Sequence, residues 1–465
     1  MFRRRFQNSQ IMHREKRQFI RSATHGGVAA LGAGAFLSAT ACLALFHPFG
    51  GDTVKSALLV MASTAGAISL ADIVWQKVHR RPSTGLDFGQ DFPSWPRALQ
   101  KFFGLVVTLG LMGFLYWLFP EYRGNFYDRY FRLLRLLLPF WLVAAVPYFF
   151  LIDRKMLDPY DGYWHMAKLA FFQWKSVDGR IVRQHLLGWL VKAYFLPLMF
   201  VAMCAGIDNV TSWKFSRLGD FKALFDIIFS GLYFIDVGLV SMGYLLSLRI
   251  TDTHFRSAEP SAIGWLVALV CYQPFWSLFG GVYLNYGTGY RWDLWLWGSP
   301  FLYTVWGSVI LMLTGLYVWA SVIFGARFSN LSHRGIITNG PYRWTKHPAY
   351  LAKNLSWWMI SVPFVTQGTV SVILNHCLLL VALNFIYVMR AKTEERHLSR
   401  DPVYVQYALW IDRHGMFRFI RRLPLLRPLA YRQPTAQWPS SEWSSSPPSP
   451  EPEPRPGASE PLRLR

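Results

Sequence analysis

Long runs of apolar residues, separated by short polar stretches, are the dominant pattern along the chain. A run of about 20 apolar residues can cross a bilayer as a helix, so the pattern predicts about ten transmembrane helices. The expected spans are Val28–Phe46, Ala57–Trp75, Phe102–Phe119, Leu133–Ile152, Leu186–Ala205, Ala223–Leu248, Ala262–Leu284, Phe301–Phe324, Leu355–Val365 and Val370–Met389. The ninth run is short enough to be re-entrant. We therefore expect an all-α polytopic membrane protein, integral to the membrane and multi-pass.

The charged residues between the apolar runs predict the topology. Lys and Arg are concentrated at both ends of the chain and in the loops 76–101, 153–185 and 325–353. Because cytoplasmic loops carry an excess of these residues, we expect both termini and these loops to face the cytoplasm. The loop 120–132 does not fit this assignment, since it carries Arg123, Arg129 and Arg132 on the expected outer side.

Composition narrows the class of protein further. The chain has 465 residues, of which 52% are hydrophobic and 17% aromatic, and its formal net charge is +22. These charges lie mainly between the apolar runs and at the ends, as expected for contact with lipid headgroups, so we expect a bilayer partner and no nucleic acid. The four cysteines lie inside apolar runs without close pairs, which predicts neither disulfides nor a metal site.

Four regions follow from these patterns. Residues 1–25 form a basic cytoplasmic arm, and residues 26–260 form an N-terminal transmembrane region of about six helices. Residues 261–430 form a C-terminal module that holds the candidate chemistry. Residues 431–465 are rich in Pro, Ser and Glu, and are expected to be a disordered tail because this composition cannot bury a core.

Two polar segments beside the last apolar runs contain the candidate chemistry. Gly335–Tyr350 is a loop rich in cations, and its Gly340-Pro341 and His347-Pro348 steps favour extended or turn geometry. Arg390–Tyr407 follows the last apolar run and contains the consecutive carboxylates Glu394 and Glu395. Both segments are expected at the same face of the membrane.

The order of motif residues in these segments resembles the isoprenylcysteine carboxyl methyltransferase and phospholipid methyltransferase superfamily of integral-membrane enzymes. The residues that carry the resemblance are Gly340, Tyr342, His347, Pro348, Tyr350, Glu394, Glu395, Leu398, Tyr404 and Tyr407. The resemblance extends over roughly residues 300–420. Lys346 stands where the family usually has Arg, and Ala352 where it usually has Gly.

The resemblance implies S-adenosylmethionine as the cofactor, held by the C-terminal helices and facing the cytoplasm. Such a cofactor needs cations for its carboxylate, a carboxylate for its ammonium and aromatic walls for its adenine. Arg343, Lys346 and His347 provide the first of these, and Glu394 and Glu395 the second. The candidate cofactor-binding residues are Gly340, Tyr342, Lys346, His347, Pro348, Tyr350, Glu394, Glu395, Tyr404 and Tyr407.

The methyl acceptor stays open at this point. A carboxylate acceptor, such as that of an isoprenylated cysteine, needs no general base, and Arg343 could orient it. An amine acceptor, such as that of a phospholipid, must lose a proton, and Glu395 is the candidate base. Arg343 and Glu395 are therefore the candidate catalytic residues for a membrane lipid or lipidated substrate. Lys353 and Asn354 depart from the family pattern and are candidates for tuning the substrate.

Other functions compete with methyl transfer. A sterol-type membrane reductase would use NADPH and would need further cations for its 2′-phosphate. A non-catalytic scaffold or transporter would need none of the motif residues. Glu394 and Glu395 could also be surface charges paired with Lys392 and Arg396. Asp236, in the middle of an apolar run, is a functional candidate because a carboxylate is costly in lipid; its plain alternative is an interhelical hydrogen bond.

Overall fold

The computed structural model describes residues 20–213, 219–287, 290–365, 368–423 and 430–432. Within these residues, eight helices are long and apolar enough to cross a membrane. They are α2 (Gly26–Phe46), α3 (Thr53–Val74), α4 (Trp95–Leu118), α5 (Asp128–Asp153), α7 (Gly179–Thr211), α8 (Phe221–Leu245), α12 (Pro300–Val322) and α14 (Val370–Leu398). The all-α polytopic membrane fold is confirmed. The basic arm before residue 20 and the expected tail from residue 433 lie outside the described residues.

Two of the expected spans are not continuous transmembrane helices. The seventh run divides into α9 (Ala262–Leu269), α10 (Phe275–Leu278) and a π-helical turn (Phe279–Tyr283). Pro274 lies just before α10, and a proline cannot donate the backbone hydrogen bond that would continue α9.

The ninth run belongs to α13 (Pro348–Ser361), a helix of 14 residues. At 1.5 Å per residue it is about 21 Å long, which is shorter than the hydrocarbon core. It ends because Val362, at the C-cap, has a left-handed backbone with φ of 37°, and Pro363 follows it. The residue before a proline disfavours helical geometry.

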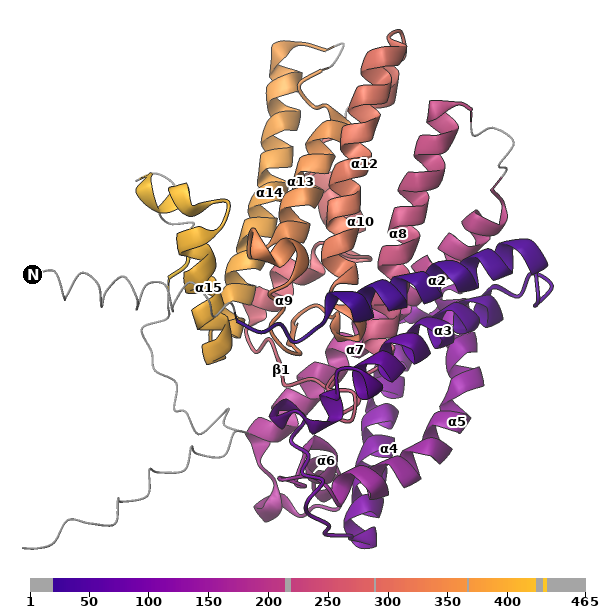
Figure 1. Ribbon diagram of the computed structural model, residues 1–465, viewed down its shortest axis with the longest axis vertical. Coiled ribbons are helices and arrows are strands. Elements are labelled where there is room, and N and C mark those ends of the chain that lie inside the picture. Colours follow the sequence, from indigo (N-terminus) through magenta and orange to yellow (C-terminus); the bar gives the residue numbers. More distant parts are fainter. Residues whose placement is uncertain (1–19, 214–218, 288–289, 366–367, 424–429, 433–465) are drawn as a thin grey trace, which may run out of the picture.

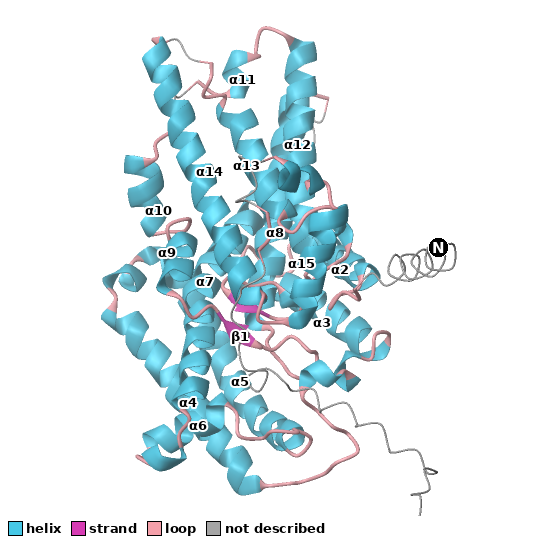
Figure 2. Cartoon of the chain, turned by 90° about the vertical axis from the view of Figure 1, so that its left-hand side faces the viewer, coloured by secondary structure: helices cyan, strands magenta, loops and turns pink. Residues whose placement is uncertain are grey.

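The helices form an upright bundle and a second group that runs beneath and across it (Figures 1 and 2). In Figure 1, α12, α13 and α14 stand in the upper part with α8 beside them, while α2 and α3 cross the middle. The group α4, α5 and α6 (Gly162–Ala170) lies at the lower end. The short helices α11 (Trp292–Trp295) and α15 (Pro402–His414) flank the upper bundle and its base.

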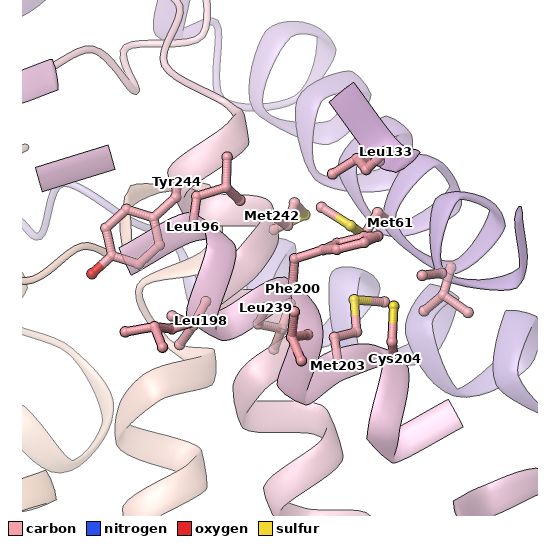
Figure 3. Packing of buried hydrophobic residues seen from close by; sticks show 14 of the residues in the cluster. Met61, Leu133, Leu196, Leu198, Phe200, Met203, Cys204, Leu239, Met242 and Tyr244 are labelled. Atoms are coloured by element: carbon pink, nitrogen blue, oxygen red, sulfur yellow. The ribbon is translucent and has the colours of Figure 1, made fainter. Parts of the chain in front are cut away.

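The largest hydrophobic core lies around α7, the longest helix, and connects the two groups (Figure 3). Phe200 and Met203 of α7 are fully buried, and Met242 of α8 lies against them. Met61 of α3 and Leu133 of α5 complete this part of the core. Because α8 is shared by this core and the upper bundle, the N-terminal region packs directly against the C-terminal module.

The three cations of the loop 120–132, which do not fit the charge pattern, have partners within the described structure. Arg129 lies 2.6 Å from a carboxylate oxygen of Asp208, and Arg132 lies 2.5 Å from one of Asp52. Arg123 donates to a backbone carbonyl. The side of the membrane on which the termini lie stays a prediction.

A buried arginine joins the loop after α12 to the N-terminal region. Nη1 of Arg327 lies 3.4 Å from a carboxylate oxygen of Asp72 in α3, and Nη2 lies 3.6 Å from one of Asp252. Arg327 also donates to the backbone carbonyls of Thr251 and Asp252. All three charged side chains are buried, so this pairing is protected from water.

Arg334 holds the same loop through hydrogen bonds to backbone carbonyl oxygens. Its guanidinium donates to the carbonyl oxygens of Thr253 and Gly243, each at 2.7 Å, and of Phe328 at 3.0 Å, and also to that of Leu246. A two-residue strand pair lies next to it, in which β1 (Ser257–Ala258) is antiparallel to β2 (Ser332–His333). The loop that leads to the candidate site is therefore anchored on both sides.

We predict that Arg327→Met lowers the free energy of unfolding by about 3–5 kcal/mol, because it leaves Asp72 buried without its ion-pair partner, whereas Asp252 keeps Arg256 at 3.2 Å. The apparent Tm of the detergent-purified protein measures this. Arg132→Met is the matched control: the Arg132–Asp52 pair is half-exposed and is expected to contribute about 0–1 kcal/mol. Equal Tm values for the two variants would contradict a dominant role for the buried junction.

Candidate active site

The loop before α13 begins with a glycine that the backbone requires. Gly340 has φ of +57°, in the left-handed region that glycine tolerates best. A Cβ atom here would also lie 3.2 Å from Cγ1 of Ile323, which is too close for an ordinary contact. Gly340 opens a 3₁₀ turn, Gly340–Arg343, that directs the chain toward α13.

His347 and Pro348 form the start of α13. His347 is the N-cap residue and Pro348 is the first helical residue, where its missing N–H costs nothing. The ring of His347 stacks on that of Tyr350, with centroids 5.5 Å apart and an interplanar angle of 3°. The first turn of α13 therefore presents an imidazole and a phenol side by side.

The last turns of α14 bring the two carboxylates to this helix start. Glu395 is buried, and its oxygens lie 2.6 Å from Nζ of Lys346 and 3.1 Å from Nζ of Lys392. Glu394 accepts a hydrogen bond from the hydroxyl of Tyr350. Burial raises the pKa of Tyr350 well above its ordinary value, so this hydroxyl is the donor.

His347 lies between the two carboxylates. Its Nδ1 is 3.7 Å from Glu394 Oε2, and its Nε2 is 3.4 Å from Glu395 Oε1. The Nε2 atom is buried and has no hydrogen-bond partner among the described residues. We use the name carboxylate cluster for Lys346, His347, Lys392, Glu394 and Glu395.

The two tyrosines of α15 lie against this cluster in different ways. The hydroxyl of Tyr407 donates to the carbonyl oxygen of Tyr342 at 2.7 Å and so fixes the loop. The hydroxyl of Tyr404 is buried without a hydrogen-bond partner in the described part of the chain. Burial raises the pKa of both tyrosines, and the nearby charge of Glu395 raises it further, so both hydroxyls remain protonated.

The motif residues differ in how closely they meet. Lys346, His347, Tyr350, Glu394 and Glu395 come together through the contacts above. Gly340, Tyr342, Pro348 and Tyr407 shape the backbone around them. Arg343, the candidate for orienting an acceptor, is exposed and lines a surface groove with Trp344, His414, Gly415 and Met416.

A C-terminal segment, Ala430–Arg432, lies over the carboxylate cluster, a position that the motif spacing did not predict. Nζ of Lys346 lies 4.9 Å from the ring centroid of Tyr431, whose hydroxyl is 2.7 Å from Ser399 Oγ. The carbonyl of Ala430 accepts from Nζ of Lys392 at 3.2 Å. Tyr431 is buried, although the sequence analysis assigned it to the tail. One feature of the sequence could have indicated this burial: Tyr431 is an aromatic residue between a basic segment and a Pro- and Ser-rich one.

Arg390, one turn before the carboxylates, lies among tyrosine rings. Its guanidinium carbon is 5.1 Å from the ring centroid of Tyr350, 5.3 Å from that of Tyr387 and 5.7 Å from that of Tyr272. It donates to Oδ1 of Asn330 at 3.2 Å. A guanidinium over aromatic faces is stabilised by their quadrupoles. This cation was not among the candidate site residues.

The comparison with protein families agrees with this geometry. Residues 304–400 match the model of the isoprenylcysteine carboxyl methyltransferase (ICMT) family. This ICMT segment includes α13, the loop before it and both carboxylates, and it ends before Tyr404. The resemblance stated from the motif residues is confirmed, and a membrane methyltransferase is supported. No curated protein and no solved structure matches the chain.

Proposed function

We propose that this protein transfers a methyl group from S-adenosylmethionine to an acceptor embedded in the membrane, at the cytoplasmic face. The observation that carries the proposal is the carboxylate cluster. Within the ICMT segment, two carboxylates, two lysines and a histidine are linked by contacts of 2.6–3.7 Å where the end of α14 meets the start of α13.

The cluster fits the amino acid end of this cofactor. A zwitterion needs an anion and a cation at close range, and Glu395 with Lys346 and Lys392 offers both. The hydroxyl of Tyr404 is buried without a hydrogen-bond partner within the described structure, and Nε2 of His347 has only its 3.4 Å contact with Glu395. Such atoms are costly unless a ligand or water satisfies them. A polar cofactor would supply the missing partners.

Each residue then has a role in binding or orientation. Glu395 would hold the ammonium group of the cofactor, and Lys346 and Lys392 its carboxylate. Tyr350 holds Glu394 in position through its hydrogen bond. Tyr431 would cover the cofactor and keep water out of the cluster, since its ring already lies over Lys346. When bound, S-adenosylmethionine supplies the electrophilic methyl group; the protein contributes mainly positioning.

We predict that Glu395→Gln and His347→Ala each weaken the binding of S-adenosylhomocysteine by about 10-fold or more. The reason is that a hydrogen bond to a charged group contributes about 1.5–3 kcal/mol. Calorimetry on the detergent-purified protein measures the affinity. Glu121→Gln, at an exposed position far from the cluster, is the control and should bind as the wild type does.

The same measurement with NADPH tests the competing enzyme class. If the protein binds NADPH but does not bind S-adenosylhomocysteine, it is a reductase and not a methyltransferase. If both cluster variants bind S-adenosylhomocysteine with wild-type affinity, the carboxylate cluster does not bind the cofactor.

We predict that Tyr431→Ala speeds the dissociation of S-adenosylhomocysteine by about 10-fold, through loss of an aromatic contact of about 1–2 kcal/mol. Tyr431→Phe keeps the ring and loses only the bond to Ser399, so it should stay within about threefold of the wild type. Release of the radiolabelled ligand under excess cold ligand gives the rates. Identical rates for the wild type and Tyr431→Ala would show that the segment plays no part in retention.

A further inference from the structure

A surface groove lies beside the carboxylate cluster, and none of its residues has a role in the proposed cofactor site. We use the name Arg343 groove for it. One wall is the loop before α13, with Arg343 and Trp344, and the other is the end of α15, with His414, Gly415 and Met416. Its volume is about 300 Å³, at the lower end of the usual range for small-molecule pockets. A ligand of the size of a lipid headgroup therefore fits in it.

The two walls of the Arg343 groove are joined through the backbone. The N–H of Met416 donates to the carbonyl oxygen of Trp344 at 2.8 Å. Gly415 permits this approach, because a Cβ atom here would lie 2.6 Å from the carbonyl oxygen of Ile411 and 2.8 Å from that of Trp344. Both distances are shorter than any ordinary contact. The groove is therefore a built feature of the loop and α15.

The segments that form the Arg343 groove carry an excess of cations. Residues 335–350 contain no Asp or Glu, and residues 402–432 contain six Arg and one carboxylate, that of Asp412. This carboxylate accepts from the backbone N–H of Tyr431 at 3.4 Å, so it holds the segment that covers the carboxylate cluster. The guanidinium of Arg343 is exposed, and a guanidinium matches a phosphate group with two parallel hydrogen bonds. The groove thus favours a phosphate.

An exposed apolar strip of α12 leads to the Arg343 groove. Val305, Met312 and Trp319 are exposed and are spaced seven residues apart, so they lie on one face of the helix. Because α12 is long and apolar enough to cross the membrane, this face meets lipid. The ring of Trp319 lies 5.6 Å from that of Trp344, which lines the groove. The lipid-facing strip and the groove are therefore continuous.

Two tryptophans place the groove at the level of the lipid headgroups. Trp319 is three residues before the end of α12, and Trp344 lies against it. Tryptophan is enriched where the membrane meets water. Figures 1 and 2 show α15, which forms the other wall, at the base of the upper bundle. A phosphate in the groove and acyl chains along α12 would therefore lie at the depths that a phospholipid of the bilayer has.

We propose that the Arg343 groove binds the phosphate of an anionic phospholipid, whose acyl chains lie along the exposed strip of α12. Arg343 donates to the phosphate oxygens, and His414 lines the opposite wall. The walls belong to the loop that carries Lys346 and to the helix that carries Tyr407, so the bound lipid holds both at the membrane surface. This lipid is a ligand and not the methyl acceptor. The inference goes beyond the proposed function, because it requires no methyl transfer.

Native mass spectrometry of the full-length, detergent-purified protein tests the proposal, since it counts bound lipids and a titration gives their affinity. Phosphatidylglycerol is the probe, because it has an anionic phosphate and neither the amine nor the carboxylate of the two acceptor classes. Phosphatidylcholine, which has no net charge, and glycerol 3-phosphate, which has no acyl chains, are the comparison ligands. We expect phosphatidylglycerol to bind about 10-fold more tightly than either.

Arg343→Gln should lower the affinity for phosphatidylglycerol by about 10-fold, because the hydrogen bonds from the guanidinium to the phosphate are lost. Arg123→Gln is the matched control and should bind as the wild type does. Arg123 is also exposed, and it lies 5.8 Å from the ring centroid of Trp117 near the end of the transmembrane helix α4, but it does not line the groove.

A second pair of variants tests the charge of the groove without removing a cation. Met416 is exposed, so its substitution is compatible with folding. Met416→Glu places a carboxylate beside the phosphate and should bind phosphatidylglycerol about 10-fold more weakly than Met416→Gln, which has the same length and no charge.

Three results would overturn the lipid site. They are equal affinities for phosphatidylglycerol in the wild type and Arg343→Gln, equal affinities of the wild type for phosphatidylglycerol and phosphatidylcholine, and equal affinities for phosphatidylglycerol and glycerol 3-phosphate. The last result would make the groove a site for a soluble anion. Loss of affinity in Arg343→Gln and not in Arg123→Gln, together with the difference between the two Met416 variants, would support the site. Calorimetry with S-adenosylhomocysteine tests the proposed function separately.

Discussion

The buried pairing of Arg327 with Asp72 and Asp252 is the interaction on which the rest of the structure depends. It joins the loop after α12 to α3 and to the segment that precedes β1. Charges in a protein interior must be paired or hydrogen-bonded, because their desolvation costs several kcal/mol each. The pairing therefore permits few positions for this loop. Arg334, seven residues after Arg327, fixes the loop a second time through its hydrogen bonds to backbone carbonyl oxygens. The position of the chain is therefore set before it reaches Gly340 and His347.

The same rule accounts for the layout of the carboxylate cluster. Glu395 is buried between two lysines, and Glu394 is held by the hydroxyl of Tyr350. The carboxylates and Lys392 come from the end of α14, and Lys346, His347 and Tyr350 come from the start of α13 and the loop just before it. Neither helix could bury its charges without the other. The polar ends of two helices thus form one site, with the ICMT segment supplying both.

The N-terminal region contacts the loop that leads to this site and helps to position it. Ser22 and Thr24, just before α2, lie within hydrogen-bond distance of the side chain of Asn339. Through α8 the same region contributes Asp236, whose carboxylate accepts a hydrogen bond from the hydroxyl of Tyr317 in α12. The expected boundary at residue 260 was placed where the pattern of the sequence changes, and it does not divide the structure into two separate parts. In space, β1 before that boundary pairs with β2 after it.

The sequence alone determined the membrane class, most of the long helices and the two segments that meet at the site, because apolar run length and motif order are local properties. Tertiary structure decided what depends on distant partners. Pro274 and Pro363 interrupt runs that hydrophobicity alone would extend into spans. Lys346 pairs with Glu395, and Tyr431 covers that pair from outside the motif. Asp236 accepts a hydrogen bond from Tyr317, which lies 81 residues further along the chain. This interhelical hydrogen bond follows from the packing of α8 on α12, which sets side-chain directions that no spacing along the chain encodes.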